Sequence, residues 1–398
     1  AGNGDHQGSG RVGGDGVMKV SLTDICDFQG GTQPPKDEWI DQPAQGYVRM
    51  LQIRDFTQSD KNYIEYVKDT GKLKTCIEDD ILIGRYGASI GKILTGLAGA
   101  YNVAIVKTIP DEKVVSKKYL YWYLNSQYFQ RFISNVGSRA AQAGFNKNDL
   151  GVAQIPLVDK ERQEEICEVL EKANKLISLR KQQLAKLDEL IKARFVEMFG
   201  TFPANPFRWD TGKIQDVVSD VRYGSSRPAV EDGKYPYLRM NNITYSGELD
   251  LRDTKRIDIP DSELDKCTVR RGDVLFNRTN SKELVGKTCV YNRDELMVLA
   301  GFVIRVRVNE RIRSDVLSAF LNMDFSKRML IGMCKTAIGQ ANINAKELQN
   351  IDLYIPPIEL QDQFVALKNK IDQQKQTVQQ SLEKLELLKK ALMQEYFG

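Results

Sequence analysis

Two arginines are the residues of this chain best suited to binding chemistry, because each ends a short apolar run in a repeated pattern. The runs are D-I-L-I-G-R, which ends at Arg85, and D-V-L-F-N-R, which ends at Arg278. Arginine carries a planar fork of donors that matches guanine edges and phosphate oxygens. A surface salt bridge is the alternative for either residue alone, and the recurrence in both halves of the chain favours binding.

The near absence of histidine removes several kinds of catalysis at once. The single histidine, His6, lies in a glycine-rich segment, residues 1–17, which we interpret as an expression remnant outside the fold. Without histidine, the folded body has no His-based acid–base catalysis, no Ser–His or Cys–His pair and no His metal ligand. The six cysteines are scattered without a C-x-x-C pair, which indicates reduced thiols in a cytoplasm and argues against zinc. We therefore expect neither catalytic nor metal-binding residues.

Two loops, residues 137–147 and 334–346, combine basic, amide and small residues. Such a loop can approach a DNA backbone closely and offer donors to phosphates or bases. A connector whose Asn and Gln side chains satisfy backbone groups is an equal alternative. The candidate DNA-binding residues, taken from the loops, the run ends and the nearby turns, are Arg49, Arg85, Lys92, Arg139, Gln142, Asn146, Arg239, Arg278, Asn280, Lys287, Gln340, Asn342 and Asn344.

A near match to a phosphate-binding loop, S-x-x-x-x-G-K-T, occupies residues 281–288, but serine stands where that loop needs its first glycine. The corresponding stretch of the first half, I-G-K at Ile90–Lys92, has no Ser or Thr after its lysine. We interpret both as Gly-Lys turns beside a strand, with Lys92 and Lys287 free to meet a DNA phosphate. The sequence has no Gly-rich cofactor loop of a methyl-transferring enzyme, so we expect no cofactor in this chain.

These residues belong to a chain that repeats itself. Residues 142–200 and 340–398 follow nearly the same pattern 198 positions apart: each begins Q-A-x-[FI]-N, passes an I-P pair and ends a long helical stretch at F-G. The globular parts repeat more loosely. Y-V-R-M-L-Q-I at Tyr47–Ile53 echoes Y-L-R-M-N-N-I at Tyr237–Ile243, which pairs Arg49 with Arg239. A repeat of this size predicts a pseudo-symmetric molecule.

Short apolar runs bounded by Gly, Asn and Asp predict strands in each globular part, and one helix of moderate length follows, at about 117–134 and 314–331. The expected fold class is α+β, with two mixed α/β domains separated by two long antiparallel helices that form a coiled coil with pseudo-two-fold symmetry. The expected segments after the remnant are an N-terminal domain at 18–155, a central helix at 156–200, a C-terminal domain at 201–355 and a C-terminal helix at 356–398.

Both long helices have an apolar stripe at spacings of three and four, and glycine stops each after about 40 residues, or roughly 60 Å. Helices this long need a partner, and the simplest partner is the other copy of the repeat. A purely structural coiled coil is the alternative to a docking role. The expected coiled-coil and partner-docking residues are Ile166, Leu170, Ile177, Leu184, Leu187, Ile191, Phe364, Ile371, Val378, Leu382, Leu385 and Leu388.

The charge of the chain permits nucleic-acid binding but does not establish it, because the net charge is only +4. The two globular parts contain five and fifteen arginines, which predicts that they bind different targets. No stretch approaches 18 uncharged apolar residues, so we expect no membrane span.

The whole arrangement resembles the specificity subunit of type I restriction–modification systems. The resemblance rests on the Q-x-x-[FI]-N…I-P-[LP]…Q segments at Gln142–Gln163 and Gln340–Gln361, each followed by a long helix ending in F-G, and it covers nearly all of Met18–Gly398. It implies that each domain reads one half of a split, asymmetric site in double-stranded DNA. It also implies that the helices hold the domains apart and dock two methyltransferase (modification) subunits. S-adenosylmethionine and ATP would then bind only to partners, among them the restriction/translocase subunits.

Two other classes of protein stay open on the sequence. A pseudo-symmetric scaffold that binds only proteins would show no salt-dependent DNA binding, even with its partners present. A single-chain enzyme would be active in isolation. If the chain does read split DNA sites, helix length acts as a ruler, because removing one turn moves the far domain by about 5.4 Å.

Overall fold

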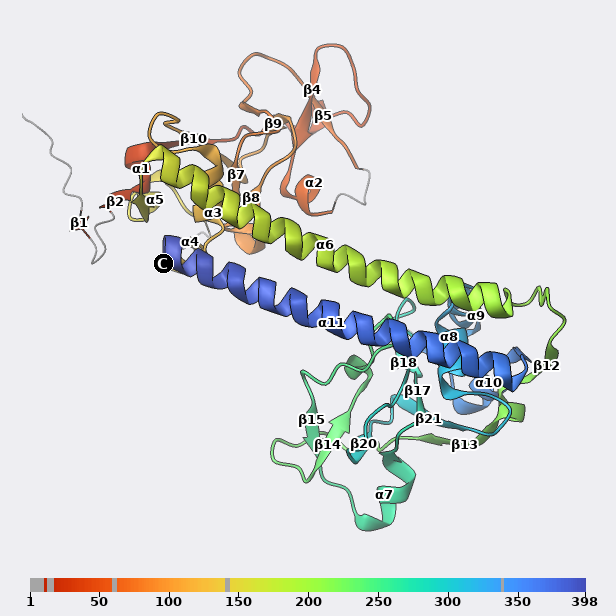
Figure 1. Cartoon of the computed structure of the whole chain (residues 1–398). Helices are drawn as coiled ribbons and strands as arrows, with labels where there is room; N and C mark the ends of the chain where they lie inside the picture. Colours follow the sequence, from red (N-terminus) through yellow and green to blue (C-terminus); the bar gives the residue numbers. More distant parts are fainter. Residues whose placement is uncertain (1–10, 13–17, 59–62, 140–143, 338–339) are drawn as a thin grey trace, which may run out of the picture. The chain divides into compact units, whose positions relative to one another are not determined.

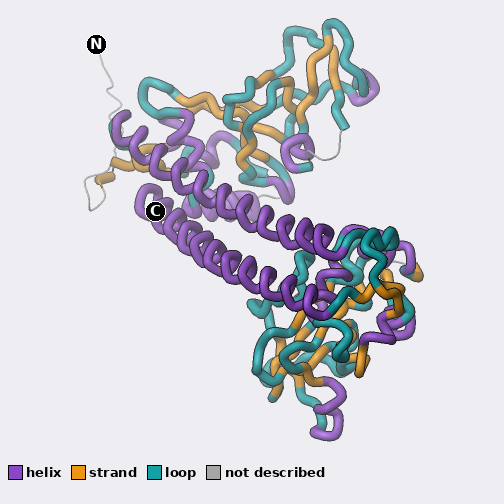
Figure 2. Tube along the Cα trace, turned by 45° about the vertical axis from the view of Figure 1, so that its right-hand side comes forward, coloured by secondary structure: helices purple, strands orange, loops and turns teal. Residues whose placement is uncertain are grey.

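The computed structural model describes residues 11–12, 18–58, 63–139, 144–337 and 340–398. The chain divides into two compact units, which we call unit 1 (residues 1–179 with 381–398) and unit 2 (residues 180–380). Each unit contains one mixed α/β domain and one half of each long helix (Figures 1 and 2). The predicted α+β class with an internal repeat is confirmed.

The domain of unit 1 alternates short strands with short helices. Its strands are β1 (Arg11–Val12), β2 (Met18–Ser21), β3 (Cys26–Gly30), β4 (Tyr47–Leu51), β5 (Tyr66–Lys68), β6 (Thr75–Cys76), β7 (Leu82–Gly84), β8 (Ile93–Leu94), β9 (Gly99–Tyr101), β10 (Ile105–Pro110) and β11 (Gln154–Leu157). Its helices and helical turns are α1 (Leu22–Ile25), η1 (Lys36–Glu38), α2 (Ile53–Thr57), η2 (Gly87–Ser89), α3 (Lys117–Leu124), α4 (Gln127–Arg139) and α5 (Lys147–Leu150).

The domain of unit 2 follows the same order. Its strands are β12 (Asp210–Lys213), β13 (Val218–Tyr223), β14 (Tyr235–Leu238), β15 (Lys255–Ile257), β16 (Thr268–Val269), β17 (Val274–Asn277), β18 (Thr279–Asn280), β19 (Thr288–Val290), β20 (Met297–Leu299), β21 (Val303–Val308), β22 (Lys335–Ala337), β23 (Gln340–Asn342) and β24 (Asp352–Ile355). Its helices and helical turns are η3 (Ile214–Val217), η4 (Met240–Asn242), α7 (Asp261–Cys267), α8 (Ser314–Asn322), α9 (Asp324–Met333) and α10 (Ala345–Gln349).

Each unit contains two four-stranded sheets built to one plan. The first sheet has the order β3-β10-β7-β8 in unit 1 and β13-β21-β17-β19 in unit 2. The second has the order β5-β4-β9-β6 in unit 1 and β15-β14-β20-β16 in unit 2, with a parallel pair at its centre in both. The repeat that the sequence shows most clearly in the helices therefore extends through both sheets.

The register of the repeat differs at one place from the one the sequence predicts. A short helix follows the central strand of the second sheet, and its capping box begins at Gln52 in unit 1 and at Arg239 in unit 2. The parallel strand pairs give the same register. Arg239 is thus equivalent to Gln52, and the pairing of Arg49 with Arg239 is wrong.

The single helix of moderate length expected in each unit is two helices. In unit 1 the break falls at Asn125 and Ser126, where the Ser126 hydroxyl accepts a hydrogen bond from the Phe129 amide and caps α4. In unit 2 the break falls at Met323, between α8 and α9. The apolar periodicity continues across both breaks, which is why the sequence pattern predicts one helix. Tyr119, Trp122 and Tyr123 of α3 are buried core residues.

The two long helices, α6 (Lys160–Phe199) and α11 (Ile358–Phe397), start directly after the last strand of each domain, and Pro156 belongs to β11. A buried glutamine in the first turn ties each helix to its domain. The Gln163 side chain accepts from the Ser116 amide and donates to the carbonyls of Val114 and Val158, each at 2.9 Å. Gln361 makes the same three kinds of contact in unit 2. This explains the glutamine that ends the repeated motif.

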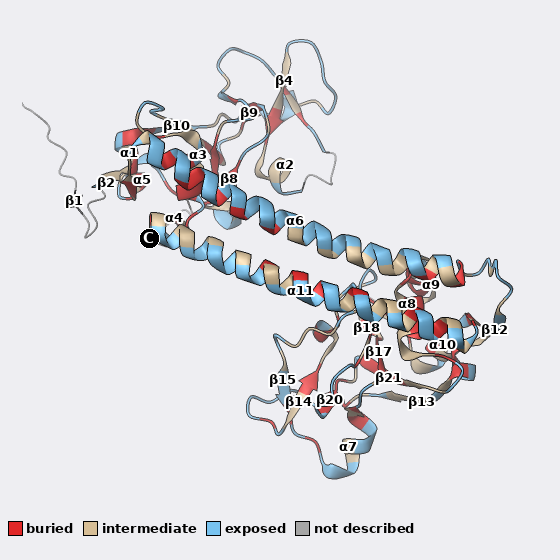
Figure 3. Cartoon of the chain, in the orientation of Figure 1, coloured by how far each residue is buried: buried red, intermediate tan, exposed pale blue. Residues whose placement is uncertain are grey.

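The helices run antiparallel, as predicted. In unit 1 Lys389 of α11 donates to Asn174 of α6, and in unit 2 Lys375 of α11 pairs with Asp188 of α6. Residue numbers rise along one helix and fall along the other between these contacts, and most of the outer surface of both helices is exposed (Figure 3).

The two long helices pack through a seam of side chains, and the residues predicted for this seam are correct with one exception. The buried members are Ile166, Leu170, Ile177, Phe364, Ile371, Val378 and Leu382, and the half-buried members are Leu184, Leu187, Ile191 and Leu385. Leu388 is 50% exposed, so its assignment to the seam is wrong. The seam passes instead through Lys389, one residue and about 100° further round the helix.

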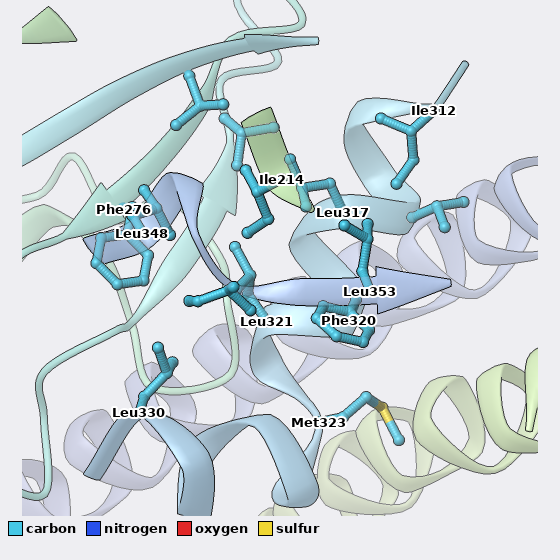
Figure 4. Close-up of a cluster of buried hydrophobic side chains, with 14 of the residues drawn as sticks. Ile214, Phe276, Ile312, Leu317, Phe320, Leu321, Met323, Leu330, Leu348 and Leu353 are labelled. Carbon is cyan, nitrogen blue, oxygen red and sulfur yellow. The ribbon is translucent and has the colours of Figure 1, made fainter. Parts of the chain in front are cut away.

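A large apolar core joins each domain to the helix ends. In unit 2 it contains Phe276, Leu317, Phe320 and Leu353 from strands and helices of the domain, which point toward one another in Figure 4. Phe199 of α6 belongs to the same core. The ends of the helices are therefore fixed by the domain cores as well as by each other.

Candidate nucleic-acid interface

Arg85 follows the central strand β7 and lies against a tyrosine. Its backbone amide donates to the Ala104 carbonyl at 2.8 Å, and its Nε donates to the Phe145 carbonyl at 2.9 Å. The guanidinium carbon lies 5.1 Å from the centre of the Tyr86 ring, within the range of a cation–π contact. Tyr86 itself is 39% exposed. The fork of Arg85 is therefore oriented by two contacts beside an exposed aromatic ring.

Arg278 occupies the equivalent position after β17 and also lies against a tyrosine. Its guanidinium carbon is 4.9 Å from the centre of the Tyr223 ring, and Tyr223 is 38% exposed at the end of β13. The Tyr223 hydroxyl accepts a hydrogen bond from the Ala345 amide at 2.8 Å. Within the described part of the chain, the Arg278 Nε has no hydrogen-bond partner. That Nε is buried, and Nη1 donates to the Gly301 carbonyl at 3.5 Å, so the guanidinium is held by the ring and by this carbonyl.

The two units form the same arginine–tyrosine contact with tyrosines from different positions in the sequence. Tyr86 is the next residue in the chain after Arg85, whereas Tyr223 comes from a strand far earlier in the sequence than Arg278. We call these two sites the Arg–Tyr pairs. A guanidinium stacked on a ring loses less side-chain freedom on binding, and its fork can meet guanine or phosphate. The sequence candidates did not include the tyrosines; the Arg85–Tyr86 dipeptide was a usable signal, but Tyr223 gave none.

Asn146 and Asn344, the asparagines that close the two candidate loops, have structural contacts. The Asn146 side-chain oxygen accepts from the Asp149 amide at 3.1 Å and caps α5. The Asn344 oxygen accepts from the amides of Lys346 and Glu347 at 2.9 Å and caps α10. These contacts match the connector alternative, and DNA contact by either asparagine stays a prediction.

The two Gly-Lys turns form as expected, but their lysines differ. Gly91 and Gly286 have φ values of +75° and +79°, which favour glycine. Lys92 is exposed, whereas Lys287 is only 7% exposed and donates to the Met240 carbonyl at 2.9 Å. Burial lowers the pKa of Lys287. The expectation of a free ammonium group is therefore wrong for Lys287, because the side chain is turned inward to hold η4.

Arg49 and Arg239 are each paired with a carboxylate. Arg49 lies 3.2 Å from Asp55, and Arg239 donates to the carboxylate of Asp253 at 2.9 Å and to its carbonyl at 3.0 Å. Their charges are thus partly neutralised inside the domain. DNA contact by either arginine stays a prediction.

The remaining candidate DNA-binding residues lie near Arg278 or outside the part of the chain that the structure describes. Strands β18 and β23 pair directly after Arg278, with Thr279 opposite Asn342 and Asn280 opposite Ala341. Asn280 accepts from the Ser281 amide at 2.9 Å. Gln142 lies outside the described residues, as do the side chains of Arg139 and Gln340. The structure therefore groups Arg278, Asn280 and Asn342 at one place in unit 2.

The comparison with protein families defines the class of the chain. A family model described as the type I restriction modification DNA specificity domain matches residues 14–189 and again residues 206–387. Because these matches cover most of the sequence, the chain belongs to this family. Members are specificity components of restriction systems in which catalysis lies in partner subunits, so the chain is not itself an enzyme.

Individual relatives agree with the family. The MjaVIII specificity subunit of Methanocaldococcus jannaschii is 24% identical over 400 residues, which cover 94% of this chain and 90% of that protein. The putative MjaX specificity subunit of the same organism is 26% identical over 196 residues, and the match spans about half of it, 46%.

Solved structures show the same fold. The S subunit of a type I system from M. genitalium has a TM-score of 0.53 at 15% identity, with 96% of both chains covered. A structure from work on assembly and conformational transition of a type I system has a TM-score of 0.57 at 17% identity, covering 95% of this chain and 97% of the other. Among the described residues, no helix combines the length and apolarity needed to cross a bilayer.

Proposed function

We propose that the chain recognises a split, asymmetric site in double-stranded DNA, with one half-site read by each domain. The observation that carries this proposal is the pair of oriented arginines, Arg85 on Tyr86 and Arg278 on Tyr223, at equivalent positions of the two domains. Unit 2 adds Asn280 and Asn342 beside its arginine, and unit 1 has the exposed Lys92. Different surroundings of a shared arginine support two different half-sites.

The two long helices are proposed to act as a ruler and as docks for two methyltransferase subunits. Exposed apolar side chains on their outer surfaces support docking of proteins; they are Val169, Leu176, Leu179, Leu190, Leu387 and Leu388. Restriction/translocase subunits complete the proposed assembly, in the cytoplasm. S-adenosylmethionine and ATP are proposed to bind only to these partners. A scaffold that binds only proteins would have the same helices. Measurements of DNA binding and methylation distinguish this alternative from DNA recognition.

Arg278→Ala should relax recognition at one base pair of one half-site and leave the other half-site unchanged. Losing one bidentate arginine contact with guanine costs about 1–3 kcal/mol of discrimination. The measurement is the methylome of cells that express the chain with its methyltransferase subunit, compared between Arg278→Ala and the natural sequence. Salt-dependent gel shifts of the same complex test DNA binding directly.

Arg271→Ala is a matched control from the other end of β17. Arg271 is exposed and pairs with Asp294 at 2.7 Å, so its loss should leave the methylome unchanged. A uniform loss of methylation in Arg278→Ala, with every base preference kept, would assign Arg278 to a phosphate. A complex that binds no DNA at any salt concentration would instead favour the protein-only scaffold.

Lengthening both helices by two turns should lengthen the spacer and keep both half-sites. Seven residues inserted after Leu179 and seven after Gln380, where the two compact units meet along the chain, add about 10 Å to each helix. At about 3.4 Å per base pair this corresponds to roughly 3 bp. Methylome sequencing measures the spacer and the half-sites together.

The control is the same insertion in α6 alone. With α11 unchanged, the pairs Asp188–Lys375 and Asn174–Lys389 could not both form, so we expect lower thermal stability and no defined new spacing. Altered half-sites at the original spacing in the doubly extended protein would rule out the ruler.

A further inference from the structure

Lys375 is a buried charge at the centre of three elements of unit 2. It lies on α11, is 7% exposed, and its ammonium group bonds to the carboxylates of Asp188 on α6 and Glu248 in the domain. Burial opposes the charge of Lys375, but the two carboxylates outweigh it and raise its pKa. One side chain therefore joins the helix pair to the domain of unit 2.

Glu248 sits in a tight turn that is itself rigidly held. The backbone amide of Glu248 donates to the Thr244 hydroxyl and its carbonyl accepts from the Thr244 amide, both at 2.9 Å. Gly247 has a φ of +86°, and a Cβ there would meet the Asn322 side chain and the Thr288 carbonyl. Glu248 is therefore fixed to the domain by the hydrogen bonds and close packing of this turn.

The turn leads directly into the second sheet of unit 2. Leu249, next to Glu248, packs against a core cluster with Leu238 of β14 and Leu299 of β20. These two strands form the parallel pair at the centre of that sheet. Lys375 therefore connects the helices to this sheet and, through Leu275 of β17 in the same cluster, to the strand that precedes Arg278.

The repeat shows that the helix seam does not need this charge. A shift of 198 residues puts Ile177 of α6 at the position of Lys375, and Ile177 is equally buried in unit 1. An apolar residue is the less costly choice for a seam, because a buried charge must recover its desolvation energy through close partners. The lysine of unit 2 thus has a role beyond helix pairing, and the contact with Glu248 is what an isoleucine could not make.

We propose that Lys375 and Glu248 form a latch that fixes the second sheet of unit 2 on the helix pair, and so sets how strictly the spacer length is enforced. The inference rests on the proposed function, in which the helices are the ruler. A DNA-binding domain that can move relative to the helices tolerates neighbouring spacer lengths, whereas a domain fixed on the helices does not. Lys375 and Glu248 are positioning residues in this scheme, and neither selects a base.

The test is Glu248→Gln in the complex with the methyltransferase subunit. This variant removes the charge from the domain side of the latch and keeps the pair of Lys375 with Asp188. Methylation is measured on duplexes whose half-sites are separated by the natural spacer and by one base pair more or less. We expect the preference for the natural spacer to fall about tenfold, with half-site preferences unchanged. Glu248 is 49% exposed in its side chain, so the variant should fold.

Lys368→Met is the matched control on the same helix, two turns earlier. Lys368 also bridges two carboxylates, Asp315 at 3.1 Å and Asp372 at 2.6 Å, but its domain contact is α8 rather than the turn that leads into the second sheet. It should lower the melting temperature and keep the spacer preference. Equal spacer preference in Glu248→Gln and the natural protein would overturn the latch. If the natural complex methylates no split site at all, the proposed function fails and the latch fails with it.

Discussion

Lys327→Gln should stabilise unit 2 by about 3 kcal/mol at pH 6 and by much less at pH 9. Lys327 is buried in α9, and its ammonium group donates to the Gly286 carbonyl at 2.6 Å. Burial, with smaller contributions from Lys192 and Lys287, lowers its pKa from 10.5 to about 7. The folded protein therefore bears the cost of a buried charge at low pH.

The sign of the pH dependence follows from proton binding. Between pH 7 and 10.5 the unfolded chain keeps the proton on Lys327 while the folded chain loses it, so stability rises with pH across this window. Below pH 7 both states are protonated and the full cost remains. Between pH 6 and pH 9 the natural protein should gain roughly 2–3 kcal/mol relative to Lys327→Gln. Urea unfolding of both proteins at several pH values measures this difference, in which the other titrating groups cancel.

The repeat supplies the reason for choosing glutamine, and a reciprocal control. In unit 1 the equivalent contact is made by Gln130, whose amide donates to the Gly91 carbonyl at 2.9 Å. Glutamine therefore fits this site without a charge. Gln130→Lys should introduce the same pH dependence into unit 1. Parallel pH profiles for Lys327→Gln and the natural protein would show that Lys327 does not titrate in this range.

The sequence predicts the long helices well because local signals determine them. Proline precedes each helix, glycine follows it, and the apolar period continues for 40 residues between them. The same period fails to show the break at Ser126, because one hydroxyl cap is enough to end a helix within an apolar run. The sequence predicts even less well which residues of the two halves are equivalent. The letters Y-x-R-M match at Arg49 and Arg239, but the capping boxes show a different register.

The site residues that the sequence could not predict depend on contacts between distant segments. Tyr223 meets Arg278 through the pairing of strands β13, β21 and β17, which no local pattern reports. Lys287 and Lys375 look like surface lysines in sequence, yet one turns inward to the Met240 carbonyl and the other meets two carboxylates. The sequence shows which charged side chains are present. Tertiary packing decides whether such a side chain faces a ligand or another part of the protein.

Phe397→Ala should destabilise unit 1 by about 3–5 kcal/mol, the usual cost of removing a buried phenylalanine side chain. Phe397 ends α11, is 1% exposed, and its ring centre lies 5.2 Å from that of Tyr119 and 6.1 Å from that of Tyr123. It belongs to the core that also contains Ile166 of α6. Its loss leaves a cavity where α11 joins this core, so residues 381–397 should exchange amide hydrogens faster. Calorimetry and hydrogen exchange measure the two effects.

Leu388→Ala is the control for Phe397→Ala, because it shortens an apolar side chain on the same helix outside the core. Leu388 is half exposed, so the change in unfolding free energy should stay within about 0.5 kcal/mol. Phe199→Ala tests the repeat, since Phe199 is fully buried against Phe195 and Phe364 in unit 2 and should cost as much as Phe397→Ala. Because each phenylalanine lies in a different core, the two variants should lower different calorimetric transitions. Equal effects of Phe397→Ala and Leu388→Ala would mean that the end of α11 contributes nothing to unit 1.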